Sequence, residues 1–335
     1  MKVHRFFLPL LGLLATLTVF SIYWLIRKIS VRTQYLLGGA IIFVCIVLSY
    51  QLPQDFIKYY HEKEIGLTDV MSHLSRSIDK YDDRDFSVAL STIGIFGYEL
   101  LGHRIIDMVG LTDSVIAKHP QEPFEGLETT WKERKYNAEY VLRQRPDYIV
   151  FSTGTKPSAP AERALFFYRP FIDTYRITGW LYQPNADIPA IISNIAYKKV
   201  RPLAGKIVPS LPLEYVQTYK QGLDTYAGGD CPGTIDYLSR AQKLAPDVFN
   251  PNLMYHIAFC YSKMNQKKQC LKLLNYILEQ DSLVISAHKD LYLFEKVYGD
   301  TLKAAVHRNW LMKLVPWSVP SFDAYVKLQA EQNQK

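Results

Sequence analysis

Six residues between positions 98 and 134 carry side chains suited to ligand chemistry. Asp107 and Asp113 could bind sugar hydroxyls or a hard cation, because carboxylates accept hydrogen bonds and coordinate such ions. Each also has a structural interpretation, since Asp107 could accept backbone hydrogen bonds at a strand end and Asp113 could favour the positive end of a helix. An aromatic ring beside polar groups could stack on a sugar. The ligand-binding candidates are Tyr98, His103, Asp107, Asp113, Glu133 and Arg134.

Common catalytic signatures are absent from the sequence. Gly94-Ile-Phe-Gly97 matches neither G-x-G-x-x-G nor a Walker loop, and a tight strand-to-helix turn accounts for both glycines. There is no G-x-S-x-G elbow, no H-E-x-x-H motif and no cysteine pair with zinc-ligand spacing. The thiols of Cys260 and Cys270 are expected to pack rather than to form a disulfide. We therefore expect no catalytic residue, no metal and no cofactor.

An α/β domain with a mostly parallel sheet is expected to position the candidates, over residues 53–205. Apolar residues at helical spacing predict a helix at 66–81, with Thr68 as its N-cap. Short alternating or buried apolar runs predict strands at 86–92, 104–109 and 147–151. Further helices are expected at 112–117, capped by Thr112, and at 133–144. Strands that alternate with helices favour parallel pairing.

Residues 213–318 predict an all-α domain of three helical hairpins similar to the tetratricopeptide (TPR) repeat. The closing positions Pro246, Ser282 and Pro316 are spaced by 36 and 34 residues, close to the period of that repeat. Stacked repeats leave a concave surface, so a protein partner is expected there; alternatively, the helices only pack against the α/β domain. Residues 319–335 are expected to form a tail. The small and turn positions are Gly222, Gly229, Thr234, Asn265, Cys270, Gly299 and Ala304.

Two N-terminal runs without charge predict a transmembrane helix hairpin over residues 1–52. The runs at 6–26 and 35–52 are long enough to cross the roughly 30 Å hydrocarbon core of a bilayer. A cleaved signal peptide is the alternative for the first run, which is long for that purpose and lacks a convincing small-x-small site. Basic residues in the loop compete with others on both flanks, but the short, charge-dense loop favours a cytoplasmic loop.

The formal net charge of +7 does not indicate a nucleic-acid partner. The basic residues are scattered among acidic ones, and the sequence contains no block of five or six like charges. A balanced surface is expected instead.

Four short motifs in succession resemble the extracytoplasmic C-terminal segment of polytopic bacterial glycosyltransferases of the GT-C fold. They are Ile93-Gly-Ile-Phe-Gly-Tyr98, Arg104-Ile-Ile-Asp-Met-Val-Gly-Leu-Thr-Asp113, Glu133-Arg-Lys-Tyr136 and Arg145-Pro-Asp-Tyr-Ile-Val-Phe151. The resemblance covers about residues 35–180 and implies lipid-linked sugar donors, with this segment outside the cytoplasm. Those enzymes need many membrane helices and an acidic residue in an early loop, whereas the loop between the two runs here has no Asp or Glu. A general base is therefore not evident.

These observations lead us to expect a bacterial inner-membrane protein with its globular portion outside the cytoplasm. Its expected role is that of an adaptor that binds a protein or an envelope glycan without catalysis of its own. One alternative is the C-terminal part or accessory subunit of a GT-C-like glycosyltransferase, acting with a separate polytopic subunit. A second alternative is a structural subunit of a membrane assembly.

Overall fold

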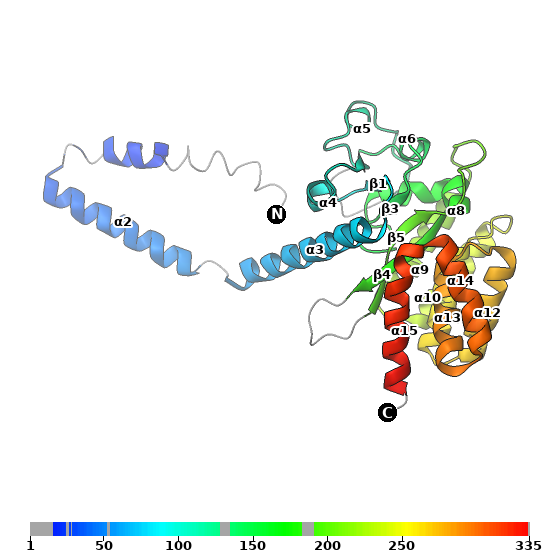
Figure 1. Cartoon of the computed structure of the whole chain (residues 1–335). Helices are drawn as coiled ribbons and strands as arrows, with labels where there is room; N and C mark the ends of the chain where they lie inside the picture. The colour runs from blue at the N-terminus through cyan, green and yellow to red at the C-terminus, as the bar shows by residue number, and fades with distance from the viewer. Residues whose placement is uncertain are drawn as a thin grey trace. The chain divides into compact units, whose positions relative to one another are not determined.

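The computed structural model describes residues 16–24, 27, 29–51, 54–127, 135–182 and 191–333. The chain divides into two compact units, Met1–Leu67 and Thr68–Lys335. Figure 1 labels most of the helices and strands.

In the first unit, residues 16–24 are helical and α2 spans Val31–Gln51. The apolar side chains of α2 are largely exposed, and Leu36 is 75% exposed. Among the residues that the structure describes, no helix combines the length and the apolarity needed to cross a membrane. The span predicted at 6–26 falls mostly outside the described ranges, and the span predicted at 35–52 falls largely on α2. The transmembrane hairpin therefore stays a prediction.

The second unit contains a five-stranded mixed sheet with strand order β2-β1-β3-β5-β4. Strands β2 and β3 pair parallel with β1, whereas β5 pairs antiparallel with both β3 and β4. The prediction of a mostly parallel sheet is therefore wrong for half of the pairings, because β4 and β5 form an antiparallel pair that needs no helical crossover. The strands are β1 (Ser87–Leu90), β2 (Arg104–Asp107), β3 (Tyr148–Val150), β4 (Tyr175–Tyr182) and β5 (Ile191–Lys199).

Buried residues alternate between the two faces of the sheet, as the period of two in a strand requires. On β1, Val88 and Leu90 pack with the end of α3 (Gln54–Tyr81) and with α4 (Ile93–Glu99). Ala89 points to the other face, into the largest apolar cluster of the molecule. The sheet is therefore buried on both faces.

Three predicted helix starts in this region are wrong. Helix α3 begins at Gln54, so Thr68 lies inside it and does not cap it. Helix α5 (Ser114–Lys118) is capped by Asp113 rather than by Thr112. The helix predicted at 133–144 corresponds to α6 (Ala138–Arg143), whose N-cap is Asn137, and residues 133–134 lie outside the described ranges. The short helices α7 (Pro160–Ala164) and α8 (Arg169–Thr174) then lead to β4.

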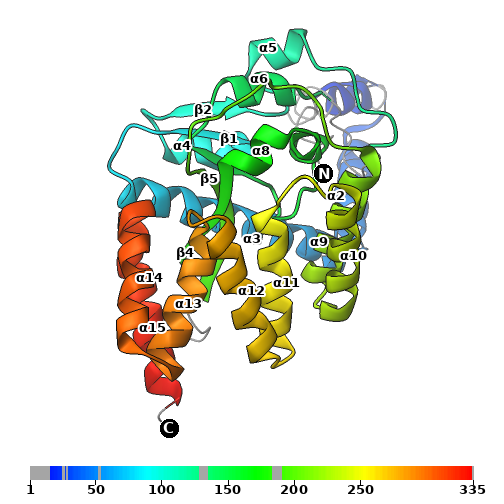
Figure 2. The same ribbon diagram turned by 90° about the vertical axis from the view of Figure 1, so that its right-hand side faces the viewer.

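The C-terminal region consists of paired helices, as predicted, and Figure 2 shows them side by side. Gly222 suits the first helix crossing, because a Cβ atom there would lie 2.7 Å from Cγ of Leu238. The residues expected to form a tail instead form α15, which packs on α13, β4 and β5. The helices are α9 (Leu213–Ala227), α10 (Cys231–Leu244), α11 (Pro251–Lys263), α12 (Lys267–Gln280), α13 (Ile285–Tyr298), α14 (Thr301–Leu314) and α15 (Val319–Asn333).

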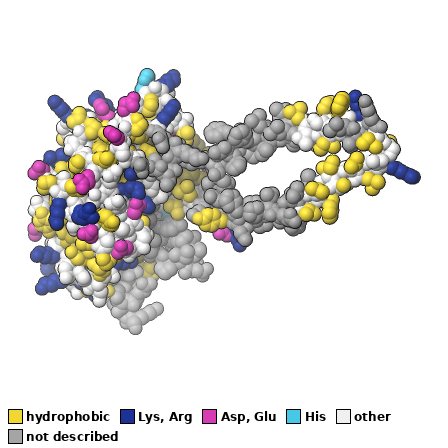
Figure 3. Space-filling model, turned by 180° about the vertical axis from the view of Figure 1, so that it is seen from behind, with side chains coloured by type: hydrophobic (Ala, Val, Ile, Leu, Met, Phe, Trp, Pro, Cys, Tyr) yellow, Lys and Arg dark blue, Asp and Glu magenta, His cyan; other side chains and the backbone are white. Residues whose placement is uncertain are grey.

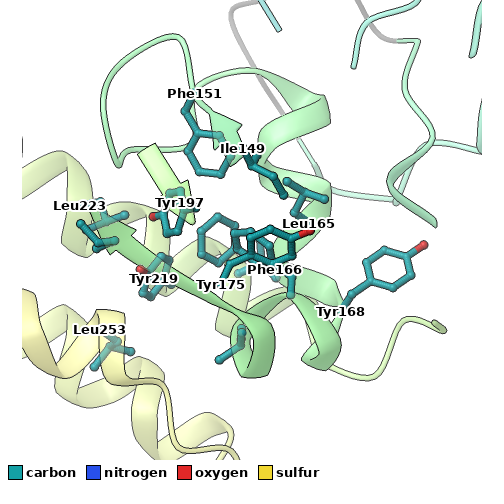
Figure 4. Close-up of a cluster of buried hydrophobic side chains, with 14 of the residues drawn as sticks. Ile149, Phe151, Leu165, Phe166, Tyr168, Tyr175, Tyr197, Tyr219, Leu223 and Leu253 are labelled. Atoms are coloured by element: carbon teal, nitrogen blue, oxygen red, sulfur yellow. The ribbon is translucent and has the colours of Figure 1, made fainter. Parts of the chain in front are cut away.

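One apolar cluster joins the sheet to the first helical pairs (Figure 4). Tyr197 on β5 lies 5.3 Å from Phe171 of α8, between ring centroids, and Phe166 lies 4.8 Å from Tyr219 of α9. Tyr197 and Tyr219 are both fully buried. The sheet and the paired C-terminal helices therefore share a core, and their separation into independent domains stays a prediction.

Candidate functional site

Asp107, a predicted ligand-binding residue, uses its carboxylate to hold its own loop. Its oxygens accept hydrogen bonds from the backbone N–H groups of Val109 (3.0 Å), Gly110 (3.2 Å) and Thr112 (2.6 Å). The side chain is nearly inaccessible, and Gly110 closes the turn with φ of +72°. This is the structural interpretation of Asp107 offered by the sequence.

Asp113 has a similar local role at the start of α5. Its Oδ1 accepts from the backbone N–H groups of Val115 (2.9 Å) and Ile116 (3.1 Å). Its Oδ2 accepts from the hydroxyl of Tyr140 at 3.2 Å, which ties α5 to α6. Both aspartates therefore stabilise the segment between β2 and α6.

Among the described candidates, Tyr98 and His103 do not join the two aspartates. His103 precedes β2 and Asp107 ends it, so the strand separates them by roughly 13 Å at about 3.3 Å per residue. The His103 ring stacks on Phe86 at 3.9 Å, between centroids, and its Nε2 lies 3.3 Å from Oδ1 of Asp79. Tyr98 is 75% exposed near the end of α4. Glu133 and Arg134 lie outside the described residues.

A buried carboxylate that the sequence analysis missed lies at the carboxyl ends of β1 and β3. Glu162 accepts hydrogen bonds from the hydroxyl of Ser91 and from the backbone N–H groups of Ser152 (2.7 Å), Ser158 (2.7 Å) and Ala159 (2.9 Å). Burial raises the pKa of Glu162, and these hydrogen bonds oppose the rise. Ligands often bind at this edge of α/β sheets. Here Glu162 secures the loop that follows β3.

A local sequence signal could have identified Glu162. Pro160 and Glu162 occupy the first and third positions of α7, and the glutamate bonds back to the N-cap residue Ala159. This is the glutamate half of a capping box. The bond from Ser91, which lies 71 residues away in the chain, has no such local signal.

A groove among the C-terminal helices is the better candidate site. It has a volume of about 490 Å³ and receives residues from α11, α12, α13 and α15. Its wall carries aromatic and aliphatic side chains together with several lysines. The residues used in the argument below are Phe259, Lys263, Lys267, Lys289, Asp290 and Tyr298.

Two lysines of this groove lie over aromatic rings. Nζ of Lys267 is 4.5 Å from the ring centroid of Tyr298, and Nζ of Lys263 is 5.3 Å from that of Phe259. Ring faces attract cations weakly at exposed positions, by roughly 0.5–1 kcal/mol. Phe259 and Lys263 are four residues apart on α11 and share one helix face, which is a signal that the sequence offered.

The groove has an excess of positive charge. Lys289 is its most buried lysine and lies 3.4 Å from a carboxylate oxygen of Asp290. Within the described ranges, neither Lys263 nor Lys267 has an ion-pair partner. Three lysines and one aspartate therefore face the groove, and two of the lysines can pair with an incoming anion.

Cys270 lines the groove, but burial raises its pKa to about 12, so its thiol stays protonated near neutral pH. The three C-terminal cysteines Cys231, Cys260 and Cys270 are free thiols. Within the described part of the chain, no three His, Cys, Asp or Glu side chains are grouped to hold a metal ion.

Comparison with known proteins gives one family match. The model of a family described as "Domain of unknown function (DUF8728)" matches residues 58–201, from within α3 to just after β5. The paired C-terminal helices lie outside that match. None of the curated proteins compared with the chain matches it.

Proposed function

We propose that this protein is a membrane-anchored adaptor that binds an acidic segment of a partner protein in the groove of its C-terminal helices. The observation that carries the proposal is the pair Lys263 and Lys267, which have no ion-pair partner among the described residues and lie over aromatic rings that line the groove. Carboxylates would pair with the ammonium groups, and apolar or aromatic side chains of the segment would contact the rings.

The shape and origin of the groove support a peptide ligand. A volume of about 490 Å³ accommodates a few side chains of an extended segment. Because its walls come from separate helical hairpins, the groove follows the stacking of the repeats, as in TPR-like arrays that bind partner proteins. Positive charge on the wall favours an acidic over a basic segment.

Attachment to the bacterial inner membrane is part of the proposal and rests on the sequence. The uncharged runs at 6–26 and 35–52 have the lengths of membrane-spanning helices. A short loop rich in basic residues between them favours a cytoplasmic loop, which would leave the globular portion outside the cytoplasm. The groove would then meet partners near the outer face of that membrane.

No comparable observation supports glycosyl transfer or glycan binding. The two aspartates that could have served a sugar, Asp107 and Asp113, already accept hydrogen bonds from backbone N–H groups and from nearby hydroxyls. Tyr98 and His103 lie toward the other end of β2. For this reason we do not propose a second function.

The experiment measures binding of two fluorescein-labelled decapeptides to the full chain in a nonionic detergent, by fluorescence anisotropy. One peptide is rich in glutamate around a central tyrosine, and the other has lysine in place of every glutamate. The matched variants are Lys263→Glu/Lys267→Glu in the groove and Lys268→Glu/Lys272→Glu on the same helical pair but outside it. Both variants change the net charge equally.

We expect the acidic peptide to bind more tightly, and the groove variant to weaken its binding about 5- to 30-fold. This range corresponds to about 1–2 kcal/mol for the loss and reversal of two exposed charges. The control variant should change the affinity less than about twofold, and added salt should reduce the difference. Equal losses in both variants would assign the attraction to overall charge, and equal affinity for the two peptides would rule out an acidic ligand.

A further inference from the structure

A second cavity, of about 410 Å³, lies at the end of β5. Lys199, the last residue of that strand, lines it. The turn between α6 and β3 supplies Arg145, and the segment after β5 supplies the remaining residues. Its lining contains three cationic side chains and no acidic one. The lining residues are Arg145, Lys199, Val200, Arg201, Pro202 and Leu203.

The backbone around Arg145 is held in an uncommon conformation. Arg145 has φ of +52°, in the left-handed region that non-glycine residues rarely adopt. Its N–H donates to the carbonyl oxygen of Leu142 at 3.0 Å, and its own carbonyl accepts from Nζ of Lys199 at 2.9 Å. The backbone N–H of Lys199 also donates to the carbonyl of Asp147 at 2.9 Å. These bonds fix the turn against the end of β5.

The three cations differ in how far their charges are already paired. Lys199 pairs with Asp147 at 2.8 Å, and Arg201 pairs with Asp281 at 2.5 Å. Asp281 also pairs with the buried Arg176, so it is shared between two guanidinium groups. Within the described residues, the guanidinium of Arg145 has no carboxylate partner. Arg145 and Arg201, whose guanidinium groups have more N–H donors than these pairs use, both line the cavity.

We propose that this cavity binds a phosphate group carried by a small organic molecule or by a lipid. A phosphate monoester has a charge of about −1.5 to −2 and three acceptor oxygens, which match several cationic donors better than a single carboxylate does. Guanidinium groups bind phosphate through two parallel N–H bonds. Val200, Pro202 and Leu203 supply an apolar wall for the organic part. The site is separate from the helical groove and does not depend on the adaptor proposal.

The first test is equilibrium dialysis of the full chain, in a nonionic detergent, against radiolabelled inorganic phosphate at constant ionic strength. Two variants remove the unpaired guanidinium: Arg145→Gln and Arg145→Gly, the second of which also suits the positive φ. The control is Arg240→Gln, an equal charge change on α10, where Arg240 is exposed. A second arm measures displacement of bound phosphate by dihexanoyl phosphatidic acid, with dihexanoyl phosphatidylcholine as the zwitterionic comparison.

We expect saturable phosphate binding that both Arg145 variants weaken about tenfold or more, and that the Arg240 variant retains. Displacement by phosphatidic acid at a much lower concentration than by unlabelled phosphate would identify a lipid headgroup as the source. Displacement at an equal or higher concentration would identify a soluble phosphate compound. Lack of saturable binding, or equal binding by the Arg145 variants and the unchanged chain, would overturn the proposal.

Discussion

A buried ion pair between Arg176 on β4 and Asp281 at the end of α12 links the sheet to the paired C-terminal helices. Nε of Arg176 donates to Oδ2 of Asp281 at 2.7 Å, and both side chains are almost fully buried. The other guanidinium nitrogens donate to the backbone carbonyls of Ile172 (2.6 Å) and Asp173 (3.0 Å). We predict that Asp281→Ala strongly destabilises the whole of this unit.

The expected loss of unfolding free energy is about 3–5 kcal/mol, the usual result of removing one partner from a buried ion pair. The guanidinium of Arg176 would keep its carbonyl contacts but lose the charge that compensates its burial. That burial already lowers the pKa of Arg176, against the opposing effect of Asp281. Arg201 also loses a partner, but its side chain is 40% exposed, so water can replace much of that contact.

Urea denaturation of the full chain in a nonionic detergent, followed by tryptophan fluorescence, measures the change. With a slope of about 2 kcal/mol per M, a loss of 3–5 kcal/mol lowers the midpoint by about 1.5–2.5 M. The control is Glu139→Ala, which breaks the exposed Arg143–Glu139 pair and should cost less than about 0.5 kcal/mol. The double variant Arg176→Met/Asp281→Leu should cost less than the sum of its single variants, since no unpaired buried charge remains.

A midpoint shift below about 0.5 M for Asp281→Ala would refute this reasoning, because it would mean that water reaches Arg176 or that the pair is not formed. Strict additivity in the double variant would also contradict it. Two separate unfolding transitions in the unchanged chain would show that the sheet and the C-terminal helices do not unfold as one unit.

Two further predictions concern a turn and a buried histidine. Gly110→Ala should lower the free energy of unfolding by about 1–3 kcal/mol, and by more than Gly205→Ala does. Both glycines have positive φ, but only at Gly110 would a Cβ atom lie 2.9 Å from a backbone nitrogen. Urea midpoints compare the two, and equal shifts would contradict a steric effect at Gly110. Burial lowers the pKa of His256 to about 4, whereas the unfolded chain protonates histidine near 6.5. The stability that neutral His256 contributes is therefore present above pH 6.5 and is lost as the pH falls toward 4. Between pH 7 and 4.5, the free energy of unfolding should fall by about 2–3 kcal/mol less in the His256→Gln variant than in the unchanged chain. Equal losses in urea titrations at the two pH values would refute this assignment.

The local elements were largely predictable from the sequence. The strands β1, β2 and β3 lie inside the predicted runs, because short buried apolar segments bounded by turn residues identify strands without knowledge of their partners. The paired helices after residue 213 followed from apolar periodicity in the same way. Among the described residues, the missed elements include β4, β5, the short helices α7 and α8, and α15. Their sequences carry several polar residues, and burial against distant segments stabilises them.

The candidate sites were much less predictable. The sequence analysis selected residues by chemical type, and Asp107 and Asp113 were plausible until their nearest backbone N–H groups were known. A concave binding surface was predicted for the C-terminal helices. The lysines that line the observed groove were not predicted. The charged residues are scattered along the sequence and gave no sign of a local excess of positive charge. On the face shown in Figure 3, basic and acidic side chains are also interspersed.

By itself, the sequence determined the segments of strands β1, β2 and β3, the hairpin pattern of the C-terminal region and the two uncharged N-terminal runs. These properties depend on residues a few positions apart, whose spacing fixes which face of an element is apolar. Only the tertiary structure decided that β5 pairs antiparallel with β3, which brings Lys199 to Arg145, and that Asp281 meets Arg176. Such contacts join residues 54 and 105 positions apart, where the packing of whole elements, rather than local preference, selects the neighbours.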